Sequence, residues 1–250
     1  MAIRNRPAWQ SGHLLDAQTD AGERRARTGE VHVRDLSALS RRIENDIGAQ
    51  VPLPDPAGGG RRASVLLLLE EHVPCRTAGT GILSLHANDP TAGHTLAACS
   101  DAELAVEELF FWAVIPWWTQ DPALSASGRV ASRARQAGHA GRWLGPLLSA
   151  LPELNTVVLL GRSTSTRWEQ ALAGARAEVP AGLAVLRAPH TSPMTWNMTD
   201  RRTGRLNREV VHEVLCEARS TSSRPGHASP RGGHRTDTGE RWTPVRPAAW

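Results

Sequence analysis

Four short apolar runs, separated by longer amphipathic stretches, dominate the middle of the chain. The runs are SVLLLLE (64–70), LFFWAVI (109–115), TVVLLG (156–161) and LAVLRAP (183–189). Each run is bounded by polar residues, Gly or Pro. Short, almost wholly apolar runs of this kind are typical of strands that are buried on both faces of a parallel sheet.

Helical periodicity lies before, between and after these runs. The pattern predicts helices at about 36–47, 93–106, 130–151, 164–178 and 204–219. The first of them follows Asp35, a favourable N-cap residue, and stops before Gly48. Because strands and helices alternate, we expect an α/β fold, a three-layer α/β/α sandwich around a central, mostly parallel four-stranded sheet.

The two ends of the chain differ in composition from the middle. Residues 1–32 are polar, Arg-rich and poorly periodic, so we expect a loosely ordered N-terminal arm. Residues 33–219 form the predicted domain, in which 51–62 is expected to be an irregular loop because Pro and Gly are dense there. Residues 220–250 have few large apolar residues and predict a disordered basic tail.

Composition narrows the classes of function. No apolar run approaches the ~18 residues of a membrane span, and no secretory signal is recognisable, so we expect a soluble, cytoplasmic monomer. The 3 cysteines form no CxxC pair, so no metal or other cofactor is implied. All 29 basic residues are Arg and the net charge is +4, which permits DNA as a partner. A GC-rich coding sequence explains the Arg usage equally well.

Ligands of open parallel sheets bind beyond the carboxyl ends of the strands, so the residues after each run are candidates for chemistry. After the first run these are Glu70, Glu71, Gly79, Gly81, Asn88 and Asp89. The two carboxylates can act on a ligand, and a backbone can approach a ligand closely at the glycines. The stretch Asp89-Pro90-Thr91 is also typical of a capped helix start.

The other three junctions carry further candidates. Trp112 near the end of the second run is more typical of a core aromatic than of a binding residue. Gly161, Arg162 and Ser163 follow the third run, where free helix amides can hold a phosphate, although N-capping by Ser163 or Thr164 explains the pattern equally well. His190 lies between prolines in the PHTSP loop, which is an unusual place for a core residue and favours a functional role.

Taken in order, these stretches resemble a bacterial group within the uracil-DNA glycosylase superfamily. The matching segments are LLEEHVP, GTGILS, NDPTA, FWAVIPWW, VVLLGRS and PHTSP, all within residues 65–197. The resemblance implies an enzyme of base excision repair. Such an enzyme flips a nucleotide out of DNA, holds its base in a pocket and hydrolyses the N-glycosidic bond.

The resemblance also implies roles for individual residues. Glu71, or its neighbour Glu70, would position the attacking water, and His190 would stabilise the departing base. The implied base pocket consists of Gly79, Gly81, Ile82, Asn88, Asp89, Trp112 and Ala113. The implied DNA contacts are Ser192, Pro193, Gly161, Arg162 and Ser163.

Two pocket positions depart from the family's pattern. Ala113 stands in place of the Asn that reads the uracil edge, and Ile82 in place of the aromatic residue that stacks on the base. The leading hypothesis is therefore a DNA glycosylase with an altered base preference. The alternative is a non-catalytic member that binds DNA or a protein partner. An unrelated α/β enzyme is disfavoured because GxSxG, GxGxxG and Walker motifs are absent.

Overall fold

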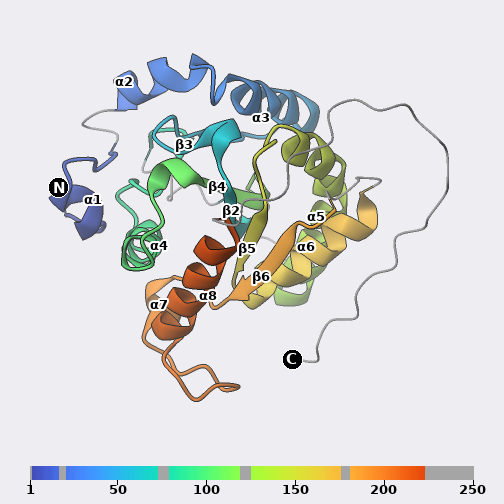
Figure 1. The fold of residues 1–250 in the computed structure, drawn as a ribbon. Coiled ribbons are helices and arrows are strands. Elements are labelled where there is room, and N and C mark those ends of the chain that lie inside the picture. The colour runs from blue at the N-terminus through green and yellow to red at the C-terminus, as the bar shows by residue number, and fades with distance from the viewer. Residues whose placement is uncertain (1, 17–20, 73–78, 119–124, 176–180, 223–250) are drawn as a thin grey trace.

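A four-stranded sheet forms the middle layer of the molecule (Figure 1). The computed structural model describes residues 2–16, 21–72, 79–118, 125–175 and 181–222. The strands of the sheet are β2 (Val65–Glu71), β4 (Leu109–Ile115), β5 (Thr156–Leu160) and β6 (Ala184–Ala188). Their order is β4-β2-β5-β6, and each pair of neighbours is parallel. The predicted fold class is confirmed.

Helices cover both faces of this sheet (Figure 1). One face carries α3 (Arg34–Ile47), α5 (Ala126–Ser149) and α6 (Arg162–Gly174), and the other carries α4 (Pro90–Asp101) and α8 (Asn207–Ser222). The short helix α7 (Pro193–Trp196) packs against α4 and α8. Helices α5 and α6 approach closely, since a Cβ added to Gly141 would lie 2.2 Å from the Ala171 carbonyl oxygen.

The predicted helices exist, but several begin earlier than the apolar periodicity indicates. Helix α4 begins at Pro90 because Asp89 caps it, its carboxylate accepting a hydrogen bond from the Ala92 amide at 2.9 Å. Helix α5 begins at Ala126 behind Ser125, whose hydroxyl accepts from the Gly128 amide. Caps therefore set these ends, whereas the first buried apolar residue of each helix comes later.

The prediction that residues 51–62 lack regular structure was wrong. Strand β1 (Leu53–Pro54) pairs in parallel with β3 (Ile82–Leu83), and a 3-10 turn, η2 (Gly60–Arg62), follows. Gly60 has a φ of +55°, and a Cβ there would lie 2.2 Å from the His32 carbonyl oxygen. The glycines of this stretch therefore allow close backbone packing rather than an irregular loop.

The N-terminal arm, defined here as residues 2–16 and 21–32, is packed against the domain rather than loosely ordered. It contains α1 (Arg6–Gln10), α2 (Ala21–Ala26) and a 3-10 turn, η1 (Arg27–Gly29). The buried Asn5 amide donates to the carbonyls of Leu85 and Ala87 at 2.8 and 2.9 Å. Leu15 forms a parallel bridge with Ala87. Single polar anchors and an isolated bridge have no periodicity, so the sequence pattern does not show this docking.

A buried polar cluster fixes the arm to the segment after β3. Asp55 accepts hydrogen bonds from the Arg24 guanidinium at 2.9 Å and from the Ser84 hydroxyl. His86 lies beside them, with Nδ1 3.8 Å from the Asp55 carboxylate. Burial lowers the pKa of His86, the charges of Asp55 and Glu107 oppose this shift, and the charges of Arg24 and His13 lower the pKa further.

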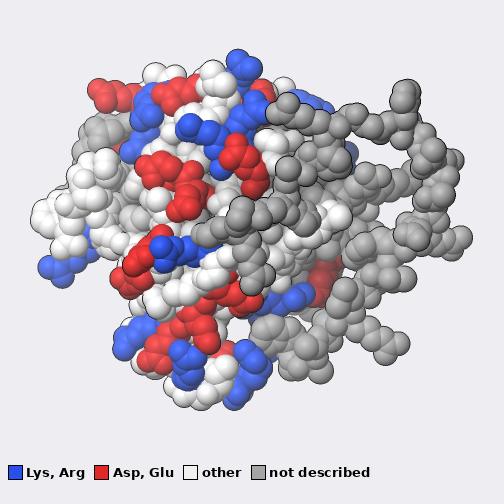
Figure 2. Space-filling view, viewed as in Figure 1, with Lys and Arg blue, Asp and Glu red and all other residues white. Residues whose placement is uncertain are grey.

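One face of the molecule is mixed in charge. On the face that Figure 2 shows, basic and acidic side chains are interspersed, and exposed pairs such as Arg205 with Glu213 bind one another. Among the described residues, no helix is long and apolar enough to cross a membrane. Of the predicted tail, residues 220–222 end helix α8, and 223–250 lie outside the described residues.

The docking of the arm predicts a large cost for an Asn5→Ala substitution. Two buried carbonyls and the N-cap of α1 would lose their partner, so we expect the free energy of unfolding to fall by about 2–4 kcal/mol. Urea titration measures this change. The exposed Gln10, at the end of the same helix, is the control, and Gln10→Ala should cost less than about 0.5 kcal/mol. Equal stabilities of the two variants would contradict the docking.

The lowered pKa of His86 predicts acid sensitivity. The folded state binds a proton at His86 less readily than the unfolded chain does. The contribution of neutral His86 to the unfolding free energy is therefore present above about pH 6.5 and is lost as the pH falls below it. We therefore expect the unfolding free energy to fall less between pH 7 and pH 5 in His86→Gln than in the parent. His212→Gln, on the exposed face of α8, is the control. A parent and His86→Gln with the same pH dependence would refute this assignment.

Candidate active site at the carboxyl edge of the sheet

The carboxyl ends of all four strands meet along one edge because the strands are parallel. From β2 the chain crosses to β4 on one side, whereas from β5 it crosses to β6 on the other side. The ends of β2 and β5 therefore border the topological switch point, where ligands of such sheets commonly bind. Glu71 is the last residue of β2, and Gly161 directly follows β5. Both expected site residues thus lie at this switch point.

Glu70 and Glu71 are the last two residues of β2, and successive side chains of a strand leave the backbone in opposite directions. Glu70 belongs to the face that α6 covers, where its carboxylate accepts a hydrogen bond from Arg167 Nε at 3.1 Å. Arg167 also donates to Gln170 at 2.8 Å and is only 6% exposed. This pair joins β2 to α6. Of the two candidate carboxylates, Glu70 is therefore held by α6, whereas the partner of Glu71 lies in α5.

An ion pair holds Glu71 in place. Arg133 of α5 brings Nη2 to 2.9 Å from Glu71 Oε1. Glu71 is 5% exposed, whereas the Arg133 side chain keeps 20% of its surface accessible. Arg133 was missed in the sequence, because the helix that carries it contains several arginines and nothing in their spacing distinguishes one from another.

Gly161 lies directly against His190. Its φ is +110°, and a Cβ added there would lie 3.2 Å from both Cβ and Cδ2 of the imidazole side chain. Its amide donates to the Ala188 carbonyl at 2.8 Å, which joins the turn after β5 to the end of β6. Since β6 is two strands away from β2, Glu71 and His190 lie on either side of the end of β5, at strand positions about 10 Å apart.

The PHTSP loop defines which nitrogen of His190 carries the proton. The backbone N–H of Ser192 donates to His190 Nδ1 at 2.9 Å. Nδ1 is therefore an acceptor, and in the neutral ring the proton resides on Nε2. The loop thus presents His190 as a hydrogen-bond donor through Nε2. A donor held in this way can stabilise negative charge that develops on a nearby oxygen.

Helix α4 anchors the same loop. The imidazole of His94 contacts the Thr191 carbonyl at 2.9 Å and stacks on the Trp196 ring with centroids 4.7 Å apart. The hydroxyls of Thr95 and Thr191 lie 2.8 Å apart. These contacts fix the backbone next to His190. None of them was predicted, because the contacting residues are nearly a hundred positions apart in sequence.

The glycine turn after β2 is in contact with the N-terminal arm. Gly79 and Gly81 have φ values of +77° and +72°, which favour glycine as expected. Arg25 of the arm donates from Nε to the Thr80 carbonyl at 2.6 Å. Ile82, at the expected base-stacking position, is fully buried in β3. Ile82 is therefore a core residue, and its buried side chain does not make the expected contact with a base.

Asn88 and Asp89 also have structural partners. The Asn88 side chain accepts from the Arg4 amide at 2.7 Å and donates to Asp16 at 3.0 Å, both in the arm. Asp89 caps α4 through the Ala92 amide. The alternative interpretation of this segment as a capped helix start is confirmed. The amide of Asn88, expected in the base pocket, is engaged by the arm.

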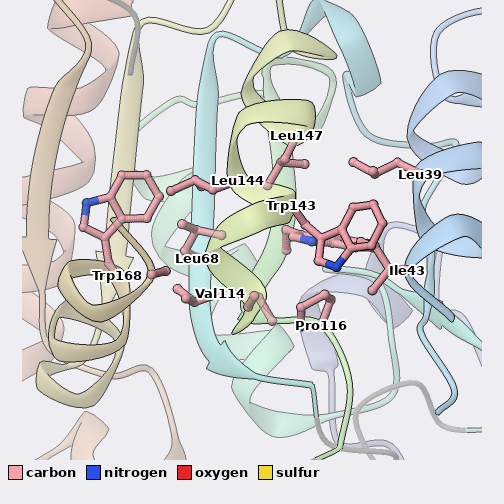
Figure 3. Close-up of a pocket in the computed structure, with 13 residues that line it drawn as sticks. Leu39, Ile43, Leu68, Val114, Pro116, Trp143, Leu144, Leu147 and Trp168 are labelled. Atoms are coloured by element: carbon pink, nitrogen blue, oxygen red, sulfur yellow. The ribbon is translucent and has the colours of Figure 1, made fainter. Parts of the chain in front are cut away.

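Trp112 and Ala113 are among the residues that line a small pocket. Figure 3 shows this pocket between the sheet, which contributes Leu68 and Val114, and the helices of one face. Its free volume of about 20 Å³ has room for about one water molecule, far too little for a base. Trp112 pairs with Leu68, well before the strand ends, and stacks on Phe110. Trp112 is therefore a core aromatic, and it does not lie at the carboxyl edge with Glu71.

The start of α6 is not capped by a hydroxyl. The N-cap is Gly161, and Thr164 instead donates its hydroxyl to the Leu160 carbonyl at 2.8 Å. The alternative of N-capping by Ser163 or Thr164 was therefore wrong. Arg162, Ser163 and Pro193 are exposed, so their side chains are accessible to a partner.

Comparison with known proteins assigns the chain to no family. No protein-family model matches the sequence, and a search of curated proteins finds no significant match. The resemblance to uracil-DNA glycosylases therefore rests on the ordered motifs alone.

The contact between Gly161 and His190 predicts a specific effect of Gly161→Ala. The added methyl group would strain the positive φ and lie 3.2 Å from the imidazole side chain. Gly161→Ala should therefore lower the free energy of unfolding by about 1–3 kcal/mol and shift the His190 ring resonances. Gly138 in α5 has open space around its Cβ position and is the control. Gly138→Ala should raise stability by about 0.5–1 kcal/mol. Denaturant titration and NMR measure both effects, and unchanged His190 resonances in Gly161→Ala would contradict the predicted coupling.

Proposed function

We propose that the chain is a DNA glycosylase-like hydrolase that acts on uracil or another deaminated base in DNA. One observation carries the proposal: Glu71 and His190 lie at the same edge of the sheet, Glu71 at the topological switch point and His190 against Gly161, which borders that point. The motif order supports the same assignment. A cytoplasmic location and action as a monomer are part of the proposal.

The proposed reaction uses two groups in different roles. Water attacks the sugar carbon and the N-glycosidic bond breaks, its electrons leaving with the base. The sugar gains the hydroxyl of the water, and the proton that the water loses ends on the released base. His190, with Nδ1 already an acceptor, would donate from Nε2 to an oxygen of the departing base. Glu71 would orient the water and stabilise the positive charge that develops on the deoxyribose. Neither role requires a metal ion.

Specific observations favour a second candidate, a non-catalytic protein that keeps the fold and binds DNA or a protein partner. Glu71 is almost fully buried and ion-paired with Arg133. Three residues implied in base recognition, Ile82, Trp112 and Ala113, are buried. A catalytic assay separates the two candidates.

The proposed function predicts base release from oligonucleotides. Single-stranded and duplex DNA containing uracil, hypoxanthine, xanthine or a mismatched uracil should give abasic sites, detected by alkaline strand cleavage. Glu71→Gln and His190→Ala should each lower the single-turnover rate by about 100-fold or more, because each removes a contribution made in the transition state.

The controls for this assay are Glu217→Gln and His212→Ala, which change the same residue types on the exposed surface of α8. Both should retain the parent's rate. If the parent releases none of these bases, and Glu71→Gln cannot be distinguished from it, the catalytic proposal is rejected and the non-catalytic candidate stands.

A further inference from the structure

The ion pair with Arg133 is in conflict with the role proposed for Glu71. A guanidinium 2.9 Å from the carboxylate offsets most of its negative charge. A carboxylate neutralised in this way gives little stabilisation to a developing positive charge on a sugar. For Glu71 to act as proposed, Arg133 must therefore release it during the reaction.

Arg133 is well suited to change partners. Its side chain is more exposed than that of Glu71, 20% against 6%. Among the described residues, its buried Nε has no hydrogen-bond partner, so part of its donor capacity is unused. Guanidinium groups bind the oxygens of phosphodiesters through two parallel hydrogen bonds. Bound DNA would bring phosphodiesters to this edge of the sheet.

We propose that Arg133 is a latch that responds to DNA. In the free protein it holds Glu71, and on DNA binding a backbone phosphodiester takes the guanidinium, so that Arg133 no longer neutralises the carboxylate that orients water. The exchange is of one anionic partner for another, so no covalent bond forms or breaks. This inference rests on the proposed function, because it requires DNA at the carboxyl edge.

The adjacent pair on β2 provides a matched comparison. Glu70 is bound by Arg167 as Glu71 is bound by Arg133, but Arg167 is 6% exposed and is also held by Gln170. Arg167 is therefore not accessible to DNA when its glutamate is changed. Glu70→Gln removes the same charge as Glu71→Gln, one residue away, and isolates the effect of releasing Arg133.

The experiment measures binding of a fluorescent duplex containing a tetrahydrofuran abasic-site analogue, by anisotropy at several salt concentrations. In Glu71→Gln the competitor for Arg133 is gone, so the duplex should bind at least about fivefold more tightly than to the parent. In Glu70→Gln the affinity should change by less than about twofold. The comparison with Glu70→Gln removes the general effect of one lost negative charge.

A double variant tests whether the gain acts through Arg133. Arg133→Met alone leaves a buried carboxylate without its partner and can impair folding. We therefore compare Glu71→Gln with Glu71→Gln/Arg133→Met, because both lack the buried charge of Glu71. The double variant should lose the fivefold gain. Thermal unfolding verifies that each variant is folded.

Two results would contradict the latch, and they have different consequences for DNA binding. If the parent binds DNA in a salt-dependent manner but Glu71→Gln and Glu70→Gln bind equally, the latch is rejected and DNA binding stands. If no variant binds DNA even at low salt, DNA as the partner is rejected, and the latch with it.

Discussion

Parallel pairing of β2 with both β4 and β5 is the constraint on which the rest of the structure depends. It places three strand ends at one edge and requires each connection to cross a face of the sheet, so helices cover both sides. Burial on both faces in turn requires the apolar runs. Glu71 and His190 lie along this edge on either side of the end of β5, because β6 is also parallel to β5, although more than a hundred residues separate them in sequence.

The segment after β2 is held in place by contacts outside the four-stranded sheet. Among the residues of this segment that the structure describes, Ile82 and Leu83 form a strand, and others accept hydrogen bonds from the N-terminal arm. Asn5 satisfies buried carbonyls there, and Arg24 joins Asp55 and Ser84 in the polar cluster. The shape of the candidate site is thus determined partly by residues that precede the sheet and contribute no strand to it.

The sequence predicted what periodicity and strand-end position encode. The four strands, the major helices and the convergence of Glu71, Gly161 and His190 follow from apolar runs and from the rule for parallel sheets. The partners of those residues could not be predicted, because Arg133 is one arginine among several in α5 and Arg25 lies in a segment without periodicity. Burial of Ile82 and Ala113 depends on packing between distant elements, which no local pattern records.

The alternation of Glu70 and Glu71 at the end of β2 has a consequence for how the chain can vary. Each glutamate contacts an arginine from a different helix, so a single-residue insertion or deletion within the strand would reverse the directions in which the two carboxylates leave it. Arg133 and Arg167 would then both lose their partners, and the leucines on the shifted side of the change would lose their core contacts. The length of β2 is therefore fixed by two charges at its end as well as by its apolar side chains.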